Sequence, residues 1–280
     1  MSEDIDFDAL RHKVVGVIGA GASAVDNAAE ALEHGAARVA MLLRRGDVPR
    51  INKGMGIGSA GFWVGFSHLT HAQKWSIVNY IDEQAVPPPR DSMLRVTRHK
   101  NFSIIPRCAP TAVRIEDGRV LLDTTRGRLG FDFLILATGL TVDWTQRPEF
   151  AALKPHVRLW GPEFTPEGHA DYAQADHPYV GPAFEFLERV PGSAPWVSRI
   201  HCFTFPAYLS HGPISGDIPA ISTGAERVAT GVATALFAED YERTFRRMVG
   251  WSNPELRGDE YVLDDDVSKF LAEQGADMKT

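Results

Sequence analysis

The sequence predicts an α/β protein whose chain opens with a parallel sheet, and three stretches near the N-terminus indicate this. Residues 13–24, KVVGVIGAGASA, join a short apolar run to a glycine turn. A helical stripe of apolar residues follows, and residues 39–43 form a second apolar run. A strand, a glycine turn, a helix and another strand are the start of a three-layer, Rossmann-like nucleotide-binding domain.

The first strand and its turn carry the clearest pattern. The apolar residues between 14 and 18 are typical of a strand buried on both faces. Gly19, Gly21 and Ala24 follow with the spacing G-x-G-x-x-G/A. The first glycine makes the turn, the second lets a pyrophosphate approach, and the small third residue packs helix on strand. We therefore expect the phosphates of a dinucleotide at Gly19, Ala20, Gly21, Ala22, Ser23 and Ala24.

The residues after the turn support this interpretation. An apolar stripe from Val25 to Leu32 predicts a short helix, and Gly35 stands where a left-handed residue ends such a helix. Residues 39–43 supply the next strand. A glycine-tolerant turn in some other α/β domain remains the alternative.

The end of the second strand indicates which nicotinamide cofactor binds. An acid at this point contacts a free ribose 2′-hydroxyl, whereas an arginine contacts a 2′-phosphate. Arg44 and Arg45 stand here, and a guanidinium forks onto phosphate oxygens. The sequence therefore favours NADP(H) over NAD(H). Asp47 leaves NAD(H) open, and a solvated strand end is the other interpretation of the two arginines.

Composition describes an ordinary globular protein of 280 residues, with 44% hydrophobic and 23% charged residues. A net charge of −7 argues against nucleic acid or an anionic membrane as the main partner. The two cysteines, Cys108 and Cys202, form no redox-active C-x-x-C pair. No apolar run reaches transmembrane length, and the acidic start is unlike a signal peptide, so we expect a soluble, cytoplasmic protein.

Between the second strand and residue 100 the sequence predicts a glycine-rich loop and a helix. Residues 46–66 carry six glycines, five of them between residues 54 and 65 among aromatic residues, which suits either a mobile loop near a ligand or a plain connection. Residues 69–85 predict a helix that the following prolines end. Its expected inward residues are Leu69, Ala72, Val78 and Ile81. His68 and His71 have metal-compatible spacing, but no acid or cysteine cluster accompanies them, so we expect no metal.

From residue 101 to residue 140 the pattern becomes β. Residues 102–105 predict a strand, and residues 112–115 and 120–123 flank the hairpin signal Glu116-Asp117-Gly118. We expect residues 126–130 to turn the chain and residues 131–136 to form a strongly apolar strand. That strand ends in Ala137, Thr138 and Gly139, small residues that allow close approach to a cofactor.

Together, KVVGVIGAGASA, the β-meander and FDFLILATG resemble the pyridine-nucleotide domain of flavoproteins with two dinucleotide-binding domains, closest to flavin-dependent class B type monooxygenases. The resemblance covers residues 4–145 well and continues more loosely to about 240. It implies an NADP turn, a phosphate site at Arg44 and Arg45, and a return of the chain to FAD after Gly139. The family's other fingerprint, for FAD, does not precede Ser2. Either the chain is part of a longer flavoprotein or it is a short form that has lost or borrows its flavin.

The second half is expected to form a loop-rich α/β segment, so we divide the chain at 1–140 and 141–280. Residues 141–196 look like loops and short helices over a site, residues 200–205 like a strand, and residues 212–216 like a turn. A stripe from Ala225 to Leu236 predicts a long helix, and Val267, Phe270 and Leu271 a peripheral one at a possible subunit contact. The resemblance places a turn near the flavin or nicotinamide ring, with the residues Gly212, Gly216 and Asp217.

Two functions follow from these observations. The resemblance implies an NADPH-dependent flavoprotein oxidoreductase of monooxygenase type, which passes hydride from NADPH to FAD and oxygenates a small organic substrate. His211 is the one weak catalytic candidate, a proton relay, although a plain hydrogen-bonding role is the favoured interpretation of a loop histidine. The alternative is a non-catalytic NADP(H)-binding or regulatory module that has lost its flavin domain. A homo-oligomer or a separate flavin-domain chain is a possible partner, and a reductase of a protein partner is less favoured.

Overall fold

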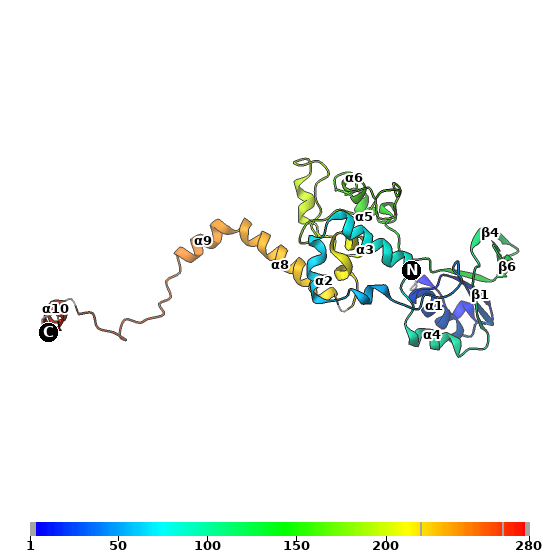
Figure 1. Ribbon diagram of the computed structural model, residues 1–280, viewed down its shortest axis with the longest axis horizontal. Coiled ribbons are helices and arrows are strands. Elements are labelled where there is room, and N and C mark those ends of the chain that lie inside the picture. The colour runs from blue at the N-terminus through cyan, green and yellow to red at the C-terminus, as the bar shows by residue number, and fades with distance from the viewer. Residues whose placement is uncertain (1–3, 219, 265, 278–280) are drawn as a thin grey trace. The chain divides into compact units, whose positions relative to one another are not determined.

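The computed structural model describes residues 4–218, 220–264 and 266–277. The chain separates into two compact units, residues 1–231 and residues 232–280 (Figure 1). The division at residue 140, made on the nucleotide-binding pattern, stays a prediction.

The first unit contains a four-stranded parallel sheet, as the sequence predicted. Its strands are β1 (Val14–Ile18), β2 (Arg38–Leu42), β3 (Phe102–Ile105) and β7 (Phe133–Leu136). They lie in the order β3-β2-β1-β7, so the first strand of the chain is central. Ile18 pairs with Leu42 on one side and with Leu136 on the other. The carboxyl ends of these three strands therefore meet at one edge.

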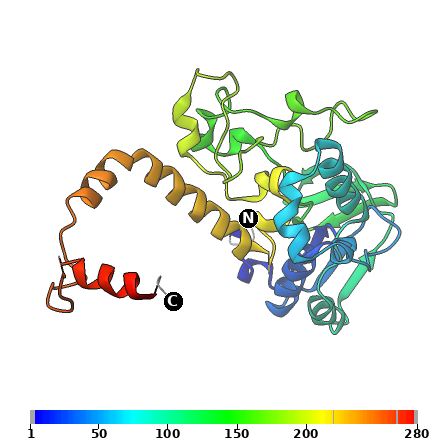
Figure 2. The same ribbon diagram turned by 60° about the vertical axis from the view of Figure 1, so that its left-hand side comes forward.

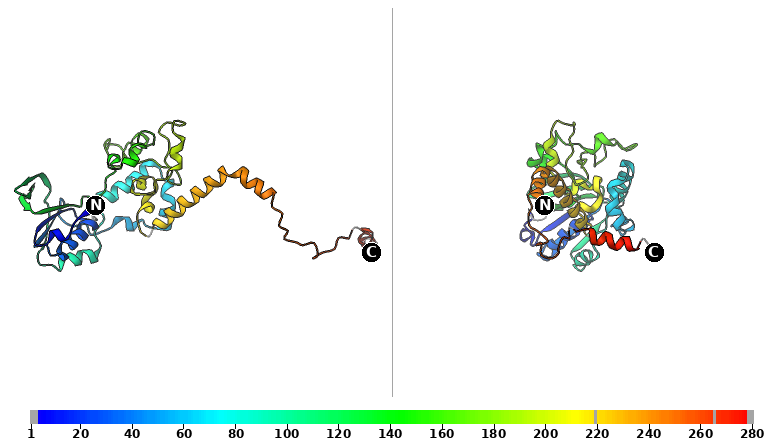
Figure 3. Two further views of the ribbon diagram at one scale, coloured as in Figure 1. Left: turned by 180° about the vertical axis from the view of Figure 1, so that it is seen from behind. Right: turned by 90° about the vertical axis from the view of Figure 1, so that its left-hand side faces the viewer.

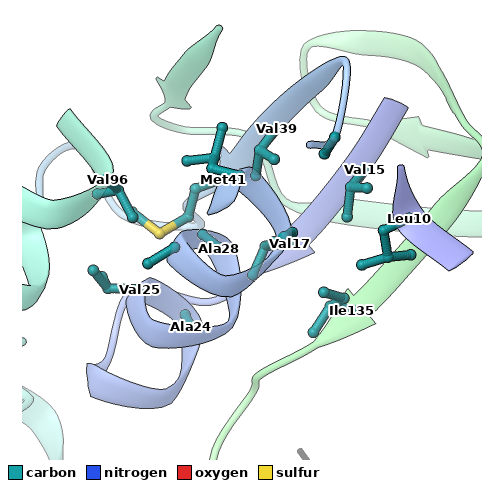
Figure 4. Close-up of a cluster of buried hydrophobic side chains, with 14 of the residues drawn as sticks. Leu10, Val15, Val17, Ala24, Val25, Ala28, Val39, Met41, Val96 and Ile135 are labelled. Carbon is teal, nitrogen blue, oxygen red and sulfur yellow. The ribbon is translucent and has the colours of Figure 1, made fainter. Parts of the chain in front are cut away.

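Helices α1 (Ala22–Glu33) and α4 (Arg90–Thr97) cover one face of this sheet. Side chains alternate along a strand, so Val15 and Val17 point to the same face and pack against α1 (Figure 4). The Arg95 guanidinium ties α4 to α1 through ion pairs with Glu30 and Glu33. The sequence analysis predicts no helix at α4, because it interprets the prolines before Arg90 only as the end of the preceding helix.

An antiparallel meander covers the other face and completes the three layers. It consists of β4 (Pro110–Glu116), β5 (Arg119–Thr124) and β6 (Gly127–Phe131), in that order. Leu122 and Phe131 of the meander pack with Ala40 and Leu42 of β2. The predicted hairpin is confirmed, since Asp117 and Gly118 have φ of 50° and 75°.

The expected turn at residues 126–130 is wrong, because these residues mostly form β6. The chain turns at Thr125 and Arg126, where the Thr124 hydroxyl accepts from the Arg126 N–H and donates to the Gly127 carbonyl. The side-chain hydrogen bonds of this turn thus come from Thr124, and Gly130 pairs with Leu121 in the meander. The apolar run that follows divides into the end of β6 and β7.

The rest of the first unit has a second core, made by segments far apart in the sequence. Helix α2 (Ala60–Gly65) and helix α3 (His71–Gln84) pack with the later segments α6 (Trp160–Glu163) and α7 (Tyr208–His211). Figures 2 and 3 show α3, in cyan, beside the yellow α7. Phe66, Val78, Trp160 and Leu209 are buried there.

Helix α3 begins as its sequence dictates. Thr70 and Gln73 form a capping box, in which each side chain bonds the other residue's backbone N–H. The predicted inward face is partly wrong, because Ala72 is exposed and Lys74 is buried. Lys74 lies on the same face as Val78, one turn away, and that face is the one that packs on Trp160.

Residues 141–215 are loop-rich, as expected, with short helical turns. These are η5 (Trp144–Gln146), α5 (Pro148–Ala151), η6 (Pro195–Arg199), η7 (Phe205–Ala207) and η8 (Gly212–Ser215), besides α6 and α7. The strand expected at residues 200–205 is wrong. Only the isolated bridge between Glu185 and His201 forms, and the helical turn that starts at Phe205 ends the extended segment.

Helix α8 (Ile221–Glu239) confirms the predicted long helix, but not its buried face. Gly224 is buried, Arg227 and Val228 are half-buried, and the predicted inward residues Ala225 and Ala229 are exposed. The face of α8 that packs on the core therefore contains Gly224 and not the predicted alanines.

In the second unit, residues 232–280 contain the end of α8, α9 (Tyr241–Val249) and α10 (Ser268–Asp277). The predicted peripheral helix corresponds to α10, and Phe270 and Leu271 on it are exposed. Among the described residues, no helix combines the length and apolar character needed to cross a membrane.

Candidate nucleotide-binding site

The site begins where β1 ends and α1 starts. Gly19 has φ of 137°, a conformation that L side chains rarely adopt. A Cβ built on Gly19 would lie 2.2 Å from the Ala137 carbonyl oxygen and 3.3 Å from the Ala24 Cβ. The glycine thus allows the turn to pass between the end of β7 and the first turn of α1.

Gly21, the second glycine of the pattern, faces open space. A Cβ on it would meet no atom within 4 Å, and its φ of −84° suits any residue. The protein itself therefore does not require a glycine here. Absence of a side chain instead leaves room for a group from outside, as the pyrophosphate interpretation predicts.

The N-terminus of α1 also suits an anion. Gly21 is its N-cap and provides no side-chain hydrogen bond, and no acidic residue lies in the first turn. Free N–H groups and the helix dipole favour negative charge at such an end. Ala22 and Ser23 are exposed there, while Ala24 is buried against the sheet.

The return strand brings the small residues Ala137, Thr138 and Gly139 to the same edge. Ala137 donates its N–H to the Ile18 carbonyl at 2.9 Å, which continues the pairing of β7 with β1. Thr138 and Gly139 are exposed beyond it, and Gly139 has φ of 103°. The structure therefore brings the glycine turn and the Ala-Thr-Gly segment together.

The two arginines after β2 differ in their contacts. The Arg45 guanidinium donates to the Glu83 carbonyl at 2.6 Å and to the Gln84 carbonyl at 3.4 Å, at the end of α3. Arg44 is exposed and forms no hydrogen bond or ion pair with the described residues. Arg44 is thus the freer of the two to meet a phosphate.

A third arginine lies beside them, and the sequence interpretation missed it. Arg107 follows β3, the neighbour of β2, and its Nη2 would lie 3.3 Å from a Cβ on Gly46. Its N–H also donates to the Arg45 carbonyl at 2.9 Å. Only the strand order, which places β3 next to β2, identifies this residue. The competing acid Asp47 lies 3.6 Å from the Arg50 guanidinium.

His211 lies apart from this edge, inside the second core. It is 2% exposed and stacks on Phe184, with ring centroids 3.9 Å apart. Arg227 donates to its Nδ1 at 2.9 Å, so the proton is on Nε2, which donates to the Gly181 carbonyl at 2.8 Å. Burial, above all, lowers the pKa of His211 to about 4, and the Arg227 charge acts in the same direction. Both ring nitrogens are used within the protein.

The three residues of the predicted flavin-proximal turn differ in their exposure. Gly212 is buried with φ of 72°, and a Cβ on it would lie 2.9 Å from the Phe66 ring. This glycine is therefore required by packing. Gly216 and Asp217 are exposed, and a role for them toward a cofactor stays a prediction.

Metal ligation finds no support in the part of the chain that the structure describes. No group of three or more His, Cys, Asp or Glu residues gathers there. His71 bonds the Tyr179 hydroxyl through Nε2 at 3.0 Å and packs edge-on to Trp160. It therefore serves the core.

Several known proteins resemble this chain, although no family model matches it. An FAD-dependent urate hydroxylase from Xanthomonas campestris pv. campestris is 34% identical over 258 residues, or 92% of this chain and 54% of that protein. L-Lysine 6-monooxygenase from Pseudomonas syringae superposes with a TM-score of 0.55 at 15% identity, over 80% of this chain and 54% of its own. The chain has a flavoprotein monooxygenase fold.

A further flavoprotein monooxygenase structure shows the same likeness. It is the Kutzneria sp. 744 ornithine N-hydroxylase with reduced FAD, NADP⁺ and L-ornithine, with a TM-score of 0.51 at 14% identity, over 83% of this chain and 56% of its own. The resemblance predicted from KVVGVIGAGASA and FDFLILATG is thus confirmed. The chain spans about half the length of each of these relatives.

Proposed function

We propose that this chain binds NADP(H) at the Gly19 turn and forms the nucleotide-binding part of an NADPH-dependent flavoprotein monooxygenase. In such an enzyme NADPH supplies hydride to FAD, and a small organic substrate is oxygenated. The observation that carries the proposal is the open space at Gly21, at an uncapped helix N-terminus, in a chain 34% identical to an FAD-dependent hydroxylase.

The residues present fit the nucleotide. The N–H groups of Ala22 and Ser23 at the start of α1 would hold the pyrophosphate. Arg44, which has no partner among the described residues, would bind the 2′-phosphate, and Arg107 stands close enough to assist. In this arrangement the protein positions the nicotinamide and excludes water from the reacting groups.

For FAD the fit is partial. Ala137, Thr138 and Gly139 leave the sheet beside the Gly19 turn, and Gly139 has φ of 103°, which favours glycine. These residues would border the flavin from the nucleotide side. The flavin's remaining contacts would come from a separate flavin-domain chain or from further sequence, which makes that partner part of the proposal.

A visible absorption spectrum of the purified full-length protein, or of the chain together with its flavin-domain partner, before and after addition of FAD, tests this function. We expect bound flavin that NADPH reduces in the absence of oxygen and that oxygen then reoxidises. A colourless protein that takes up no FAD but binds NADPH would support the alternative, a non-catalytic NADP(H)-binding module. Urate, named in the similar hydroxylase, is the first substrate to test for oxygen consumption.

A further inference from the structure

Strand β4 forms an open edge of the antiparallel meander. It pairs with β5 on one side, and the strand order β4-β5-β6 gives it no described strand on the other. Each of its residues, Pro110–Glu116, is exposed. An edge strand of this kind presents unpaired backbone N–H and C=O groups, to which a further strand can bind. The outer side of β4 is therefore a place where another chain can extend the sheet.

The edge is also apolar. Val113 is 60% exposed and Ile115 is 78% exposed. Residues opposite each other in an antiparallel pair share a face of the sheet, so Val113 stands beside the buried Leu122 and Ile115 beside the half-buried Val120. Leu122 packs on β2 as part of the core. The apolar face of the meander thus continues past the core to an edge that is open to solvent.

The usual protection of such an edge is present at one end only. Natural edge strands carry prolines, bulges or charges that block pairing with other chains. Here Pro110 begins the strand, and the pairing with β5 is irregular between Pro110 and Ala112. From Val113 onward the register with β5 is regular. The second half of β4 is therefore open to pairing with a further strand.

The charges on the opposite face select the partner. Arg114 and Glu116 lie side by side there, with 3.5 Å between Nε and Oε1. When two copies of β4 pair antiparallel with Ile115 opposite Ile115, Arg114 of each copy lies opposite Glu116 of the other. A register shift of two residues, the smallest that keeps each side chain on its face, places Arg114 opposite Arg114 or Glu116 opposite Glu116. The strand is therefore complementary to itself in this one register.

We propose that β4 pairs with β4 of a second copy of this chain, antiparallel and with Ile115 opposite Ile115, so that two meanders join into one sheet. The contact is two-fold symmetric, as in most homodimers. Val113 and Ile115 of both copies form one apolar strip, and two contacts between Arg114 and Glu116 lie on the other face. This assembly is independent of the cofactors and goes beyond the proposed function. Because only residues 113–117 of each copy pair, we expect a weak dimer with a dissociation constant of about 10–100 µM.

Sedimentation equilibrium of the full-length protein, from about 2 to 500 µM, tests the inference, and the wild type should shift from monomer to dimer over this range. Glu116→Arg and Arg114→Glu should each weaken the dimer at least about tenfold, because each places like charges opposite one another twice. An equimolar mixture of these two variants should recover the wild-type dimer, since an acid then faces a cation at both contacts. Glu167→Arg, the same change at an exposed glutamate in the loop after α6, is the control and should dimerise normally.

A further variant separates the edge from the fold. Arg114 also pairs with Asp123 at 2.8 Å, so Arg114→Glu disturbs the meander itself. Ile115→Lys avoids this disturbance, because the Ile115 side chain is exposed. It should raise the dissociation constant of the dimer at least about tenfold, while the melting temperature measured at about 2 µM stays that of the wild type.

Three results would overturn the proposal. The first is a wild-type protein that stays monomeric at about 500 µM, and the second is a dimer that Ile115→Lys and Glu116→Arg leave intact. Protection of the β4 amides from hydrogen exchange in a monomer is the third, since it would assign the edge to another part of the full-length protein. Variants that dimerise poorly alone and equally poorly when mixed would contradict the register, and with it the proposal.

Discussion

Gly19 lies directly against the carbonyl of Ala137, so the nucleotide turn and the end of the return strand share one closely packed point. The two residues are 118 positions apart in the chain. At the other end of the same two strands the Val14 N–H donates to the Asp132 carboxylate at 2.7 Å, with the same separation in sequence. Parallel pairing of β1 with β7 produces this contact. We therefore expect stability to depend on Gly19, and nucleotide binding on Gly21, which faces open space.

Gly19→Ala should destabilise the protein. A methyl group would lie 2.2 Å from a backbone oxygen, and the φ of 137° is strained for alanine. We expect the free energy of unfolding, measured by urea denaturation, to fall by at least about 2 kcal/mol. A wild-type denaturation midpoint in this variant would mean that the close approach to Ala137 is not present in solution.

Gly21→Ala should instead spare the fold and impair binding. Its Cβ would meet no protein atom within 4 Å, so the free energy of unfolding should change by less than about 1 kcal/mol. NADPH affinity should fall at least about tenfold, because the methyl occupies the space of the pyrophosphate. Gly65→Ala, another glycine with open space around it, is the control and should bind NADPH normally. Equal NADPH affinities of Gly21→Ala and Gly65→Ala would show that the pyrophosphate does not bind at this turn.

Arg44 and Arg45 should differ when each is replaced by alanine. Arg44→Ala should lower NADPH affinity about ten- to hundredfold with little effect on NADH, since a charged hydrogen bond is worth about 1.5–3 kcal/mol. Arg45→Ala should in addition lower the melting temperature, because Arg45 binds the carbonyls at the end of α3. Arg38→Ala, at the opposite end of β2, provides the control. An NADPH-to-NADH preference that survives in Arg44→Ala would contradict the 2′-phosphate assignment.

Local patterns account for what the sequence predicted correctly. Consecutive apolar residues predicted the strands β1, β2 and β3, and the run Glu116-Asp117-Gly118 predicted the hairpin turn. Gly19 was assigned to a turn for the same reason. The buried apolar run of β1, with Val15 and Val17 both in the core, required no knowledge of distant segments.

The missed features depend on contacts between distant segments. Lys74 is buried because Trp160 packs on its helix face, and nothing within α3 announces that partner. Arg227 contacts His211 because glycines let α8 approach closely, whereas the sequence stripe pointed to alanines. Arg107 joins the two predicted arginines only through the strand order. Tertiary packing, rather than periodicity, decides each of these positions.

Stability should fall as the pH drops from about 6.5 to 4. His211, whose ordinary pKa is 6.5, has it lowered to about 4, so the unfolded chain binds a proton that the folded chain does not. The stabilisation is complete above pH 6.5 and is lost toward pH 4, by about 3 kcal/mol for this residue. Burial lowers the pKa of His177 to about 4 as well, which adds to the slope. In His211→Gln, urea denaturation at several pH values should give a shallower dependence, and an unaltered slope would show that His211 is not buried neutral.

Gly224→Ala should release α8 from the first unit's core. Its methyl would lie 2.1 Å from the Ile214 carbonyl oxygen, a backbone atom that cannot move aside easily. An alanine in a helix normally stabilises by about 0.5–1 kcal/mol, and Gly65→Ala in α2 should show that gain. In Gly224→Ala the clash should reverse the sign. Because α8 carries Arg227, the released helix should also let the pKa of His211, followed by NMR, rise toward 6.5. A stabilised Gly224→Ala variant with an unchanged His211 titration would refute the docking of α8 at this glycine.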